Sequence, residues 1–250
     1  MTTQLIYTVQ KHIILGLLLV VCVSATYTWK ETTQQDYDAV TKKSGDFYDK
    51  KKHYSVKVTH TSYRGHDAVV AYEMQEGYYR YDNGSYHSLL MGIHTIQNKT
   101  YRVVIDTMAK SIQVGDPIAK RADEISEINY SNSMKDVKRF LSCAVGTGVR
   151  YRLEYNEKPT YESYETQFNQ DGMMTEMTVF YRKEYPLNPS DPNSAKAKPK
   201  LQITWTELNE KAVFAADEFS TEKYFTVVNN KLTPAAKYKA YRIADVRVKK

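Results

Sequence analysis

The sequence predicts a mainly β chain of the α+β class: a strongly curved antiparallel sheet, or incomplete β-barrel, with an N-terminal helix and one or two further helices covering it. Three observations lead to this prediction. Tyrosine is abundant, at 22 residues against 10 Gly and 7 Pro, and aromatic rings suit a pleated surface better than Gly or Pro do. A period-two alternation of apolar and polar residues starts at Tyr54. The segments that follow are joined by turns too short for parallel crossovers.

The N-terminal segment resembles a secretory signal peptide. An uncharged apolar run at 13–23 follows Lys11, and small residues suited to signal peptidase follow the run. The run is shorter than the ~20 residues that a membrane-spanning helix needs, so we expect residues 1–25 to be removed by cleavage between Ala25 and Thr26. Residues 26–250 would then form a single exported domain. Two alternatives stay open, a retained anchor and a lipoprotein acylated at Cys22.

Residues 33–51 are expected to form an amphipathic helix. Thr32 or Thr33 followed by Gln35 resembles a capping box, and apolar residues recur at three-to-four spacing along one face. A strand is then expected to start at Tyr54. Every second residue from Tyr54 to His60 lies on the same, inward face of this strand. Turn signals predict further short strands at 68–75, 77–82, 86–91, 93–97, 101–106 and 111–115.

The second half of the chain is expected to start with helix and return to strands. Val137, Phe140 and Leu141, followed by Gly146, have the spacing of a helix between Arg121 and Ala144. Strands are predicted at 149–155, 161–169, 173–183 and 201–206, and an extended end near 238–248. A Pro-rich stretch at about 186–199 is predicted to be a flexible hairpin loop.

Motifs for catalysis or metal binding are not found. The five histidines after residue 25 lie between His53 and His94, but none has the helical spacing of a zinc protease and no Cys-x-x-Cys occurs. Cys143 has apolar neighbours, so we expect a buried, unreactive thiol. The net charge of +6 is spread along the chain, which disfavours a nucleic-acid partner. We expect neither an enzyme nor a cofactor; a hydrolase would need a histidine in a cleft beside a carboxylate or thiol.

The inward positions of the predicted strands carry large, soft side chains. A packed core is one interpretation of them. The other is a curved sheet that encloses an apolar cavity, because Met and aromatic side chains adapt to a flexible acyl chain. The candidate cavity residues are Val103, Ile105, Tyr151, Leu153, Tyr155, Met177 and Trp205.

The order of elements resembles a known family. The segments Tyr54–Thr59, Gly77–Tyr81, Leu89–Gly92, Tyr101–Asp106 and Lys110–Val114 look like the N-terminal half of the periplasmic outer-membrane lipoprotein carrier family, LolA/LolB-like. The resemblance implies a periplasmic carrier whose incomplete barrel, closed by helices, holds lipid or lipoprotein acyl chains. Envelope membrane proteins would be further partners. The alternative hypothesis is an exported envelope interaction module with a packed core and no ligand.

Overall fold

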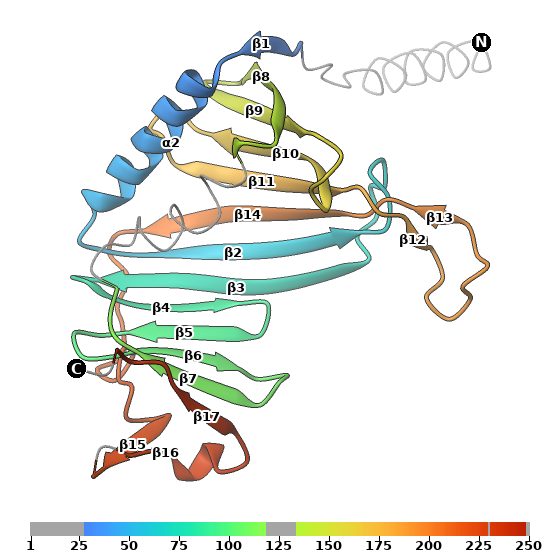
Figure 1. Cartoon of the computed structure of the whole chain (residues 1–250). Helices are drawn as coiled ribbons and strands as arrows, with labels where there is room; N and C mark the ends of the chain where they lie inside the picture. Colours follow the sequence, from blue (N-terminus) through green and yellow to red (C-terminus); the bar gives the residue numbers. More distant parts are fainter. Residues whose placement is uncertain (1–27, 119–133, 230, 249–250) are drawn as a thin grey trace, which may run out of the picture.

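The computed structural model describes residues 28–118, 134–229 and 231–248. Thirteen strands of the described chain form one large sheet (Figure 1). Its strands are β1 (Lys30–Thr32), β2 (His53–Tyr63), β3 (Glu73–Asp82), β4 (Ser85–Leu90), β5 (Ile93–Gln97), β6 (Arg102–Asp106), β7 (Ser111–Gly115), β8 (Val137–Val145), β9 (Gly148–Tyr155), β10 (Tyr161–Phe168), β11 (Met174–Tyr181), β14 (Lys200–Asn209) and β17 (Arg242–Asp245). The predicted leader, its cleavage between Ala25 and Thr26, and Cys22 lie outside the described residues.

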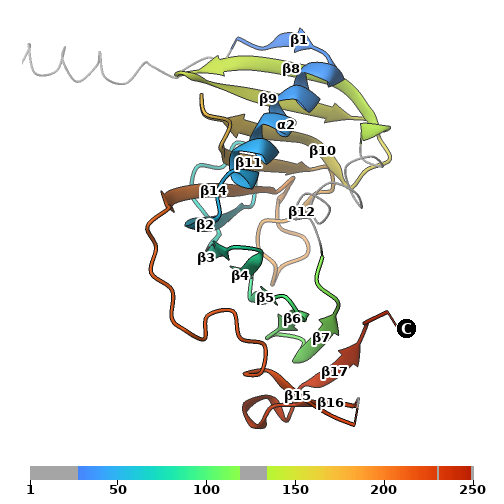
Figure 2. The same ribbon diagram turned by 90° about the vertical axis from the view of Figure 1, so that its left-hand side faces the viewer.

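The sheet has 13 strands in the order β1-β8-β9-β10-β11-β14-β2-β3-β4-β5-β6-β7-β17, and it is open. All neighbouring strands pair antiparallel except β17, which pairs parallel with β7, so the sheet is mixed rather than purely antiparallel as predicted. Figure 2 shows that the sheet is strongly twisted, because β8 and β9 lie across the view while β3 to β6 are seen nearly end-on. The mainly β character of the prediction is confirmed.

The N-terminal helix is α2 (Gln34–Asp49), and the predicted helix at 33–51 is confirmed. A capping box starts it: the Asp36 backbone N–H donates to Thr33 Oγ1 over 3.2 Å, and the Thr33 N–H donates to an Asp36 carboxylate oxygen over 3.0 Å. The box partner is therefore Asp36 and not the predicted Gln35, because the residue three positions after the cap reaches back to it. No helix among the described residues is long and apolar enough to cross a membrane.

The strands predicted between 54 and 115 are confirmed with one correction. Tyr54, Val56, Val58 and His60 are buried along β2, as expected. The predicted strand at 68–75 is wrong, since 64–72 is a loop and a single long strand, β3, starts at Glu73. The turn before β4 places Asn83 and Gly84 at positive φ, the geometry of a tight hairpin.

The predicted helix between Arg121 and Ala144 is wrong for the part that the structure describes. Residues 119–133 lie outside the described residues, and Val137–Val145 form strand β8, paired with β9 along its length. Gly146 has φ +58 and closes the β8–β9 hairpin rather than a helix. A short apolar run fits the periodicity of a helix as well as that of a strand. Here the segment forms a strand because it pairs with β9, in which charged and apolar residues alternate. Cys143 is buried on this strand, as expected, and burial raises the pKa of its thiol.

The segments outside the large sheet are short. The predicted loop at 186–199 connects β11 to β14 and contains the two-residue strands β12 (Tyr185–Pro186) and β13 (Lys196–Ala197). After β14 the chain forms a second small sheet from β15 (Phe225–Val228) and β16 (Lys231–Pro234), then the 3₁₀ turn η1 (Ala236–Tyr238), before it returns as β17. The predicted extended end is confirmed in β17.

The two halves of the sheet are covered on opposite faces. The face that we call the helix face carries Tyr54 and Tyr151, and α2 packs on it through Tyr37 and Phe47. On the other face, β15 and β16 cover a cluster of buried side chains from β5, β6 and β7: Ile96, Val103, Ile105, Ile112 and Val114. The chain therefore has separate cores on the two sides of one twisted sheet, each with its own cover.

Candidate functional site

The register of the sheet places the seven candidate cavity residues on both faces. Tyr151 is aligned with Thr166, Met177, Ile203 and His60 across five strands, so these residues share the helix face. Val103 is aligned with Ile96, His87, Arg80 and Ser55. Ser55 alternates with Tyr54 and Val56 on β2, so Val103 and Ile105 lie on the opposite face.

Val103 and Ile105 belong to the core beneath the C-terminal segment. They are 0% and 1% exposed, and Phe225 and Leu232 pack in the same cluster. Tyr101 extends this contact with its ring 5.2 Å from that of Phe225, edge to face. Protein side chains therefore surround these two candidates, and the structure does not bring them together with the other five.

Tyr151, Leu153 and Tyr155 pack beneath the helix. The Tyr151 ring lies 5.4 Å from the ring of Tyr37 on α2, and its hydroxyl donates to the Asp36 carbonyl over 3.4 Å. Burial raises the pKa of Tyr151, as expected for a phenol on an apolar surface. These three side chains form the core that holds α2 on the sheet.

Met177 and Trp205 lie further along the helix face, on strands β11 and β14. Met177 pairs with Ile203, Val179 pairs with Leu201, and Trp205 pairs with Val58. Four of these side chains are half-buried and form what we call the apolar strip: Met177, Leu201, Ile203 and Trp205. Trp205 contacts the core that includes Tyr54, whereas the other three belong to none of the three core clusters of the described residues.

His60 is the polar residue of this region. It pairs with Ile203, is 7% exposed, and its Nδ1 atom has no hydrogen-bond partner among the described residues. Burial lowers the pKa of its imidazole, so the ring is neutral at pH 7. The apolar strip is therefore uncharged along its border with β2.

A cavity of ≈ 320 Å³ lies between α2 and the β10–β11 turn. None of the seven candidates lines it. Its wall consists mainly of charged groups with one aromatic ring: Ala39, Lys42, Lys43, Asp46, Phe47, Lys50, Lys51 and Asp171. Lys43 donates to the Gln170 carbonyl and Lys51 pairs with Glu210, so these lysines anchor α2 to its neighbours.

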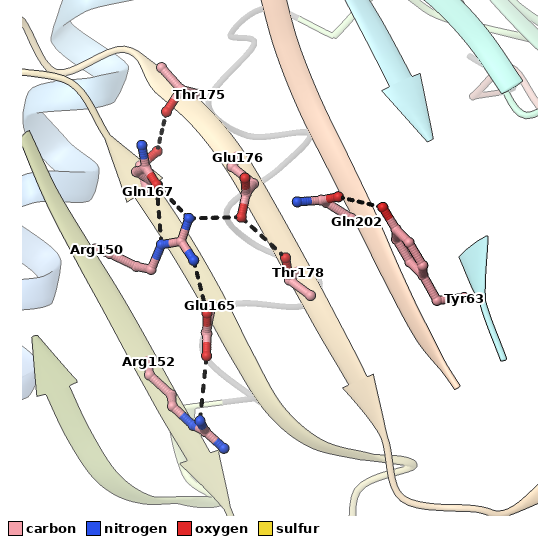
Figure 3. Close-up of polar contacts among 9 residues, drawn as sticks. All are labelled: Tyr63, Arg150, Arg152, Glu165, Gln167, Thr175, Glu176, Thr178 and Gln202. Atoms are coloured by element: carbon pink, nitrogen blue, oxygen red, sulfur yellow. Dashed lines mark hydrogen bonds and ion pairs between the residues drawn. The ribbon is translucent and has the colours of Figure 1, made fainter. Parts of the chain in front are cut away.

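The face opposite the helix carries a charged network across β9, β10 and β11 (Figure 3). Arg150 contacts Glu165 at 3.3 Å and Glu176 at 3.0 Å, and Arg152 contacts Glu165 at 3.4 Å. Burial raises the pKa of Glu165, and the two arginines oppose that effect. The alternation of charge at even positions of 149–155 is the sequence signal of this network, but it does not reveal the partners on the next two strands.

A second buried polar cluster joins the C-terminal segment to the sheet. His87 Nδ1 donates to a Glu218 carboxylate oxygen over 2.7 Å, and Arg80 contacts the same oxygen at 2.8 Å. His87 Nε2 lies 3.2 Å from both the Tyr78 hydroxyl and His94 Nδ1. Burial lowers the pKa of His87, although Glu218 opposes this.

This cluster contains a histidine beside a carboxylate, the pair that a hydrolase would need. His87 and Glu218 are 7% and 9% exposed, so both side chains are largely shielded from solvent. No group of three His, Cys, Asp or Glu side chains in the described part of the chain is arranged to hold a metal ion. Sequence reasoning missed Glu218, since nothing near it in sequence indicates that it packs on β4.

Comparison with known proteins gives weak likenesses. No family model matches the chain, and neither does any curated protein. Among solved structures, the Mycobacterium tuberculosis lipoprotein LppX is similar with a TM-score of 0.35 and 9% identity, covering 73% of this chain and 100% of its own. A DUF1329 family protein from Desulfovibrio piger has a TM-score of 0.32 and 8% identity, covering 77% and 99%. At these values neither likeness carries an argument about fold or function.

Proposed function

We propose that this chain is an exported protein of the periplasm that binds the acyl chains of a lipid or lipoprotein on the helix face of its sheet. The observation that carries the proposal is the apolar strip, where three of the four side chains lie outside the packed cores. In this proposal the twisted open sheet acts as an incomplete barrel, and α2 borders its inner face.

The proposed ligand site contains only two of the seven cavity residues predicted from the sequence. Met177 and Trp205 remain ligand candidates, with Leu201 and Ile203 beside them. Tyr151, Leu153 and Tyr155 would support α2 at the border of the site, because they contact Tyr37 and Phe168. Val103 and Ile105 would have no contact with the acyl chain, since they lie on the other face. Half-buried Met and Trp side chains suit an acyl chain because they are apolar and adaptable.

A second candidate is an envelope interaction module with a packed core. The observation that favours it is the burial of Val103, Ile105 and Leu153, each at 1% exposure or less, within continuous clusters. Such a module would use its surfaces for partners and would bind no acyl chain. The two candidates differ in a direct binding measurement.

The test is titration with fluorescent fatty acids of increasing chain length, read by energy transfer from Trp205 in a Trp29→Phe background. We expect affinity to rise by about threefold to fourfold per CH₂, because each buried CH₂ contributes about 0.8 kcal/mol. Ionic strength should change the affinity little, since no charge pairs are formed. Met177→Lys should abolish binding by placing an unpaired ammonium on the strip.

Val213→Lys is the matched control, because Val213 is 97% exposed and lies outside the strip. Circular dichroism of both variants reports whether they fold. A folded wild type that binds no fatty acid of any length would overturn the acyl-chain proposal and leave the packed interaction module.

A further inference from the structure

Several connections between strands lie at one end of the large sheet. β2 ends and β14 starts there, so the loops 64–72 and 182–199 lie side by side, and the β4–β5 and β6–β7 turns lie at the same end (Figure 1). This follows from the antiparallel order of the strands. The end lies away from the N-terminus of α2 and from the C-terminal hairpin β15–β16.

The two loops are fixed to each other and to the sheet by polar contacts. The Arg64 guanidinium donates to the Leu187 carbonyl across the two loops. His66 Nε2 donates to the Tyr181 carbonyl over 3.0 Å, and Lys200 Nζ donates to the His66 carbonyl over 2.7 Å. The backbone polar groups at the base of the loops are thereby partly satisfied, and the apolar side chains of the loops are left without a core.

These exposed apolar side chains form what we call the apolar tip: Val69, Val70, Tyr72, Met74, Tyr185 and Leu187. Val69 is 89% exposed and Val70 is 79% exposed, although both are aliphatic. Met91 and Met108, in the two turns at the same end, are exposed as well. Exposed apolar side chains that gather on neighbouring segments favour an interaction surface, because single exposed apolar residues are common but groups of them are not.

Cationic side chains accompany the tip. The Arg64 guanidinium lies 3.8 Å from the centre of the Tyr72 ring, and Lys183 Nζ lies 5.4 Å from that of Tyr185. Segments 64–74 and 182–200 together contain six Lys and Arg against four Asp and Glu. Aliphatic and tyrosine side chains beside Lys and Arg are the composition that enters the headgroup region of a bilayer, where the rings and methyl groups are buried and the cations contact lipid phosphates.

We propose that the apolar tip docks onto the surface of a membrane that contains anionic phospholipid. The inference goes beyond acyl binding at the apolar strip, because the tip is formed by different residues, on the two loops and at the start of β3. A protein partner is disfavoured by the cations stacked on the tyrosine rings, which match a layer of phosphates better than a mainly apolar protein surface. Docking at this end leaves both covered faces of the sheet intact.

The test is co-sedimentation of the purified exported chain with vesicles of phosphatidylglycerol and phosphatidylethanolamine, with Cys22→Ser in every protein so that no acyl group tethers it. We expect Val69→Ser with Val70→Ser to weaken binding at least tenfold. Val213→Ser with Val228→Ser, at exposed positions elsewhere, should bind like the parent. The parent should bind phosphatidylcholine vesicles at least threefold more weakly than the anionic vesicles.

A second measurement reports insertion directly. Tyr72→Trp, in a Trp29→Phe and Trp205→Phe background, should be quenched by brominated acyl chains in the same vesicles. Equal sedimentation of the tip variant and its parent, or an unquenched Trp at position 72, would overturn the proposal and point to a protein partner for the tip. The tip variant should bind fatty acids like its parent, so failure of docking and failure of acyl binding are distinguishable.

Discussion

His87 shows how a single side chain can connect two distant parts of the chain. It lies on β4, in the middle of the sheet, and it contacts Glu218 from the segment after β14. Neutral His87 donates from Nδ1 to this carboxylate, which leaves Nε2 as an acceptor for the Tyr78 hydroxyl at 3.2 Å. Burial acts to raise the pKa of Glu218, but hydrogen bonds from Arg80 and His87 outweigh it and lower the pKa. The pair is therefore a neutral imidazole beside a carboxylate.

We predict that stability falls as the pH is lowered through about 6.5, the ordinary pKa of histidine. Burial lowers the pKa values of His60, His87 and His94 in the folded state, so the unfolded chain binds protons more readily below that pH. Replacing His87 with Asn should make this decline shallower. Urea denaturation midpoints between pH 7.5 and 5.5 measure the effect.

His53 provides the opposite control for this prediction. Hydrogen bonds to the Ala212 carbonyl and to Asp82 raise the pKa of His53, so its contribution is present below about pH 6.5 and is lost as the pH rises. His53→Asn should therefore make the decline at low pH steeper. An equal pH dependence in the wild type and the His87→Asn variant would contradict the role assigned to burial.

At the scale of elements, glycine has a different effect in the helix and in the sheet. Gly45 lies in the interior of α2, and a methyl group added there would meet nothing within 4 Å, whereas a methyl at Gly77 on β3 would overlap the carbonyl of Leu89 on β4. Glycine therefore lowers the stability of the helix at position 45, whereas at position 77 the close approach of β4 leaves no room for a larger residue. Gly148 on β9 meets the Phe168 carbonyl in the same way.

We predict that Gly45→Ala raises the free energy of unfolding by about 0.5–1 kcal/mol, because Ala has the higher helix propensity. Gly77→Ala should lower it by about 3 kcal/mol or more, because the backbone of β4 must shift and the strand pairing with it. Chemical denaturation of the two variants beside the wild type makes the measurement. A tolerated Ala at position 77 would contradict the strand contact described here.

At the scale of the whole molecule, the C-terminal segment completes the core of β5, β6 and β7. Phe225 is 3% exposed and Leu232 is 8% exposed, and both pack on the side chains that β6 and β7 present on this face. β17 then adds to the edge of the same half of the sheet. The last strand and the hairpin before it therefore stabilise residues that come more than 100 positions earlier in the chain.

We predict that Phe225→Ala lowers the free energy of unfolding by about 3–5 kcal/mol, since it leaves a cavity above Val103 and Ile105. Val213→Ala should change it by no more than about 0.5 kcal/mol, because Val213 is almost fully exposed. Thermal or urea unfolding of the two variants compares them. A small effect of Phe225→Ala would mean that β15 and β16 are not part of the cooperative core.

Elements whose signals are local could be predicted from the amino-acid sequence alone. The apolar face of α2, the alternation of β2, and the strands predicted at 149–155 and 161–169 depend on neighbours within a few residues, and their predictions are confirmed. β8 was missed because its apolar spacing fits a helix as well as a strand, and only its pairing with β9 decides.

Which face each strand presents, and what covers that face, depends on the tertiary structure. The alternation of β6 places Val103 and Ile105 on one face but does not say that this is the face opposite Tyr151, because that depends on the register of seven intervening strands. For the same reason the seven residues predicted from the sequence to line one cavity lie on two opposite faces of the sheet. Contacts between segments far apart in the chain, such as His87 with Glu218 and Arg64 with Leu187, have no local signal at all.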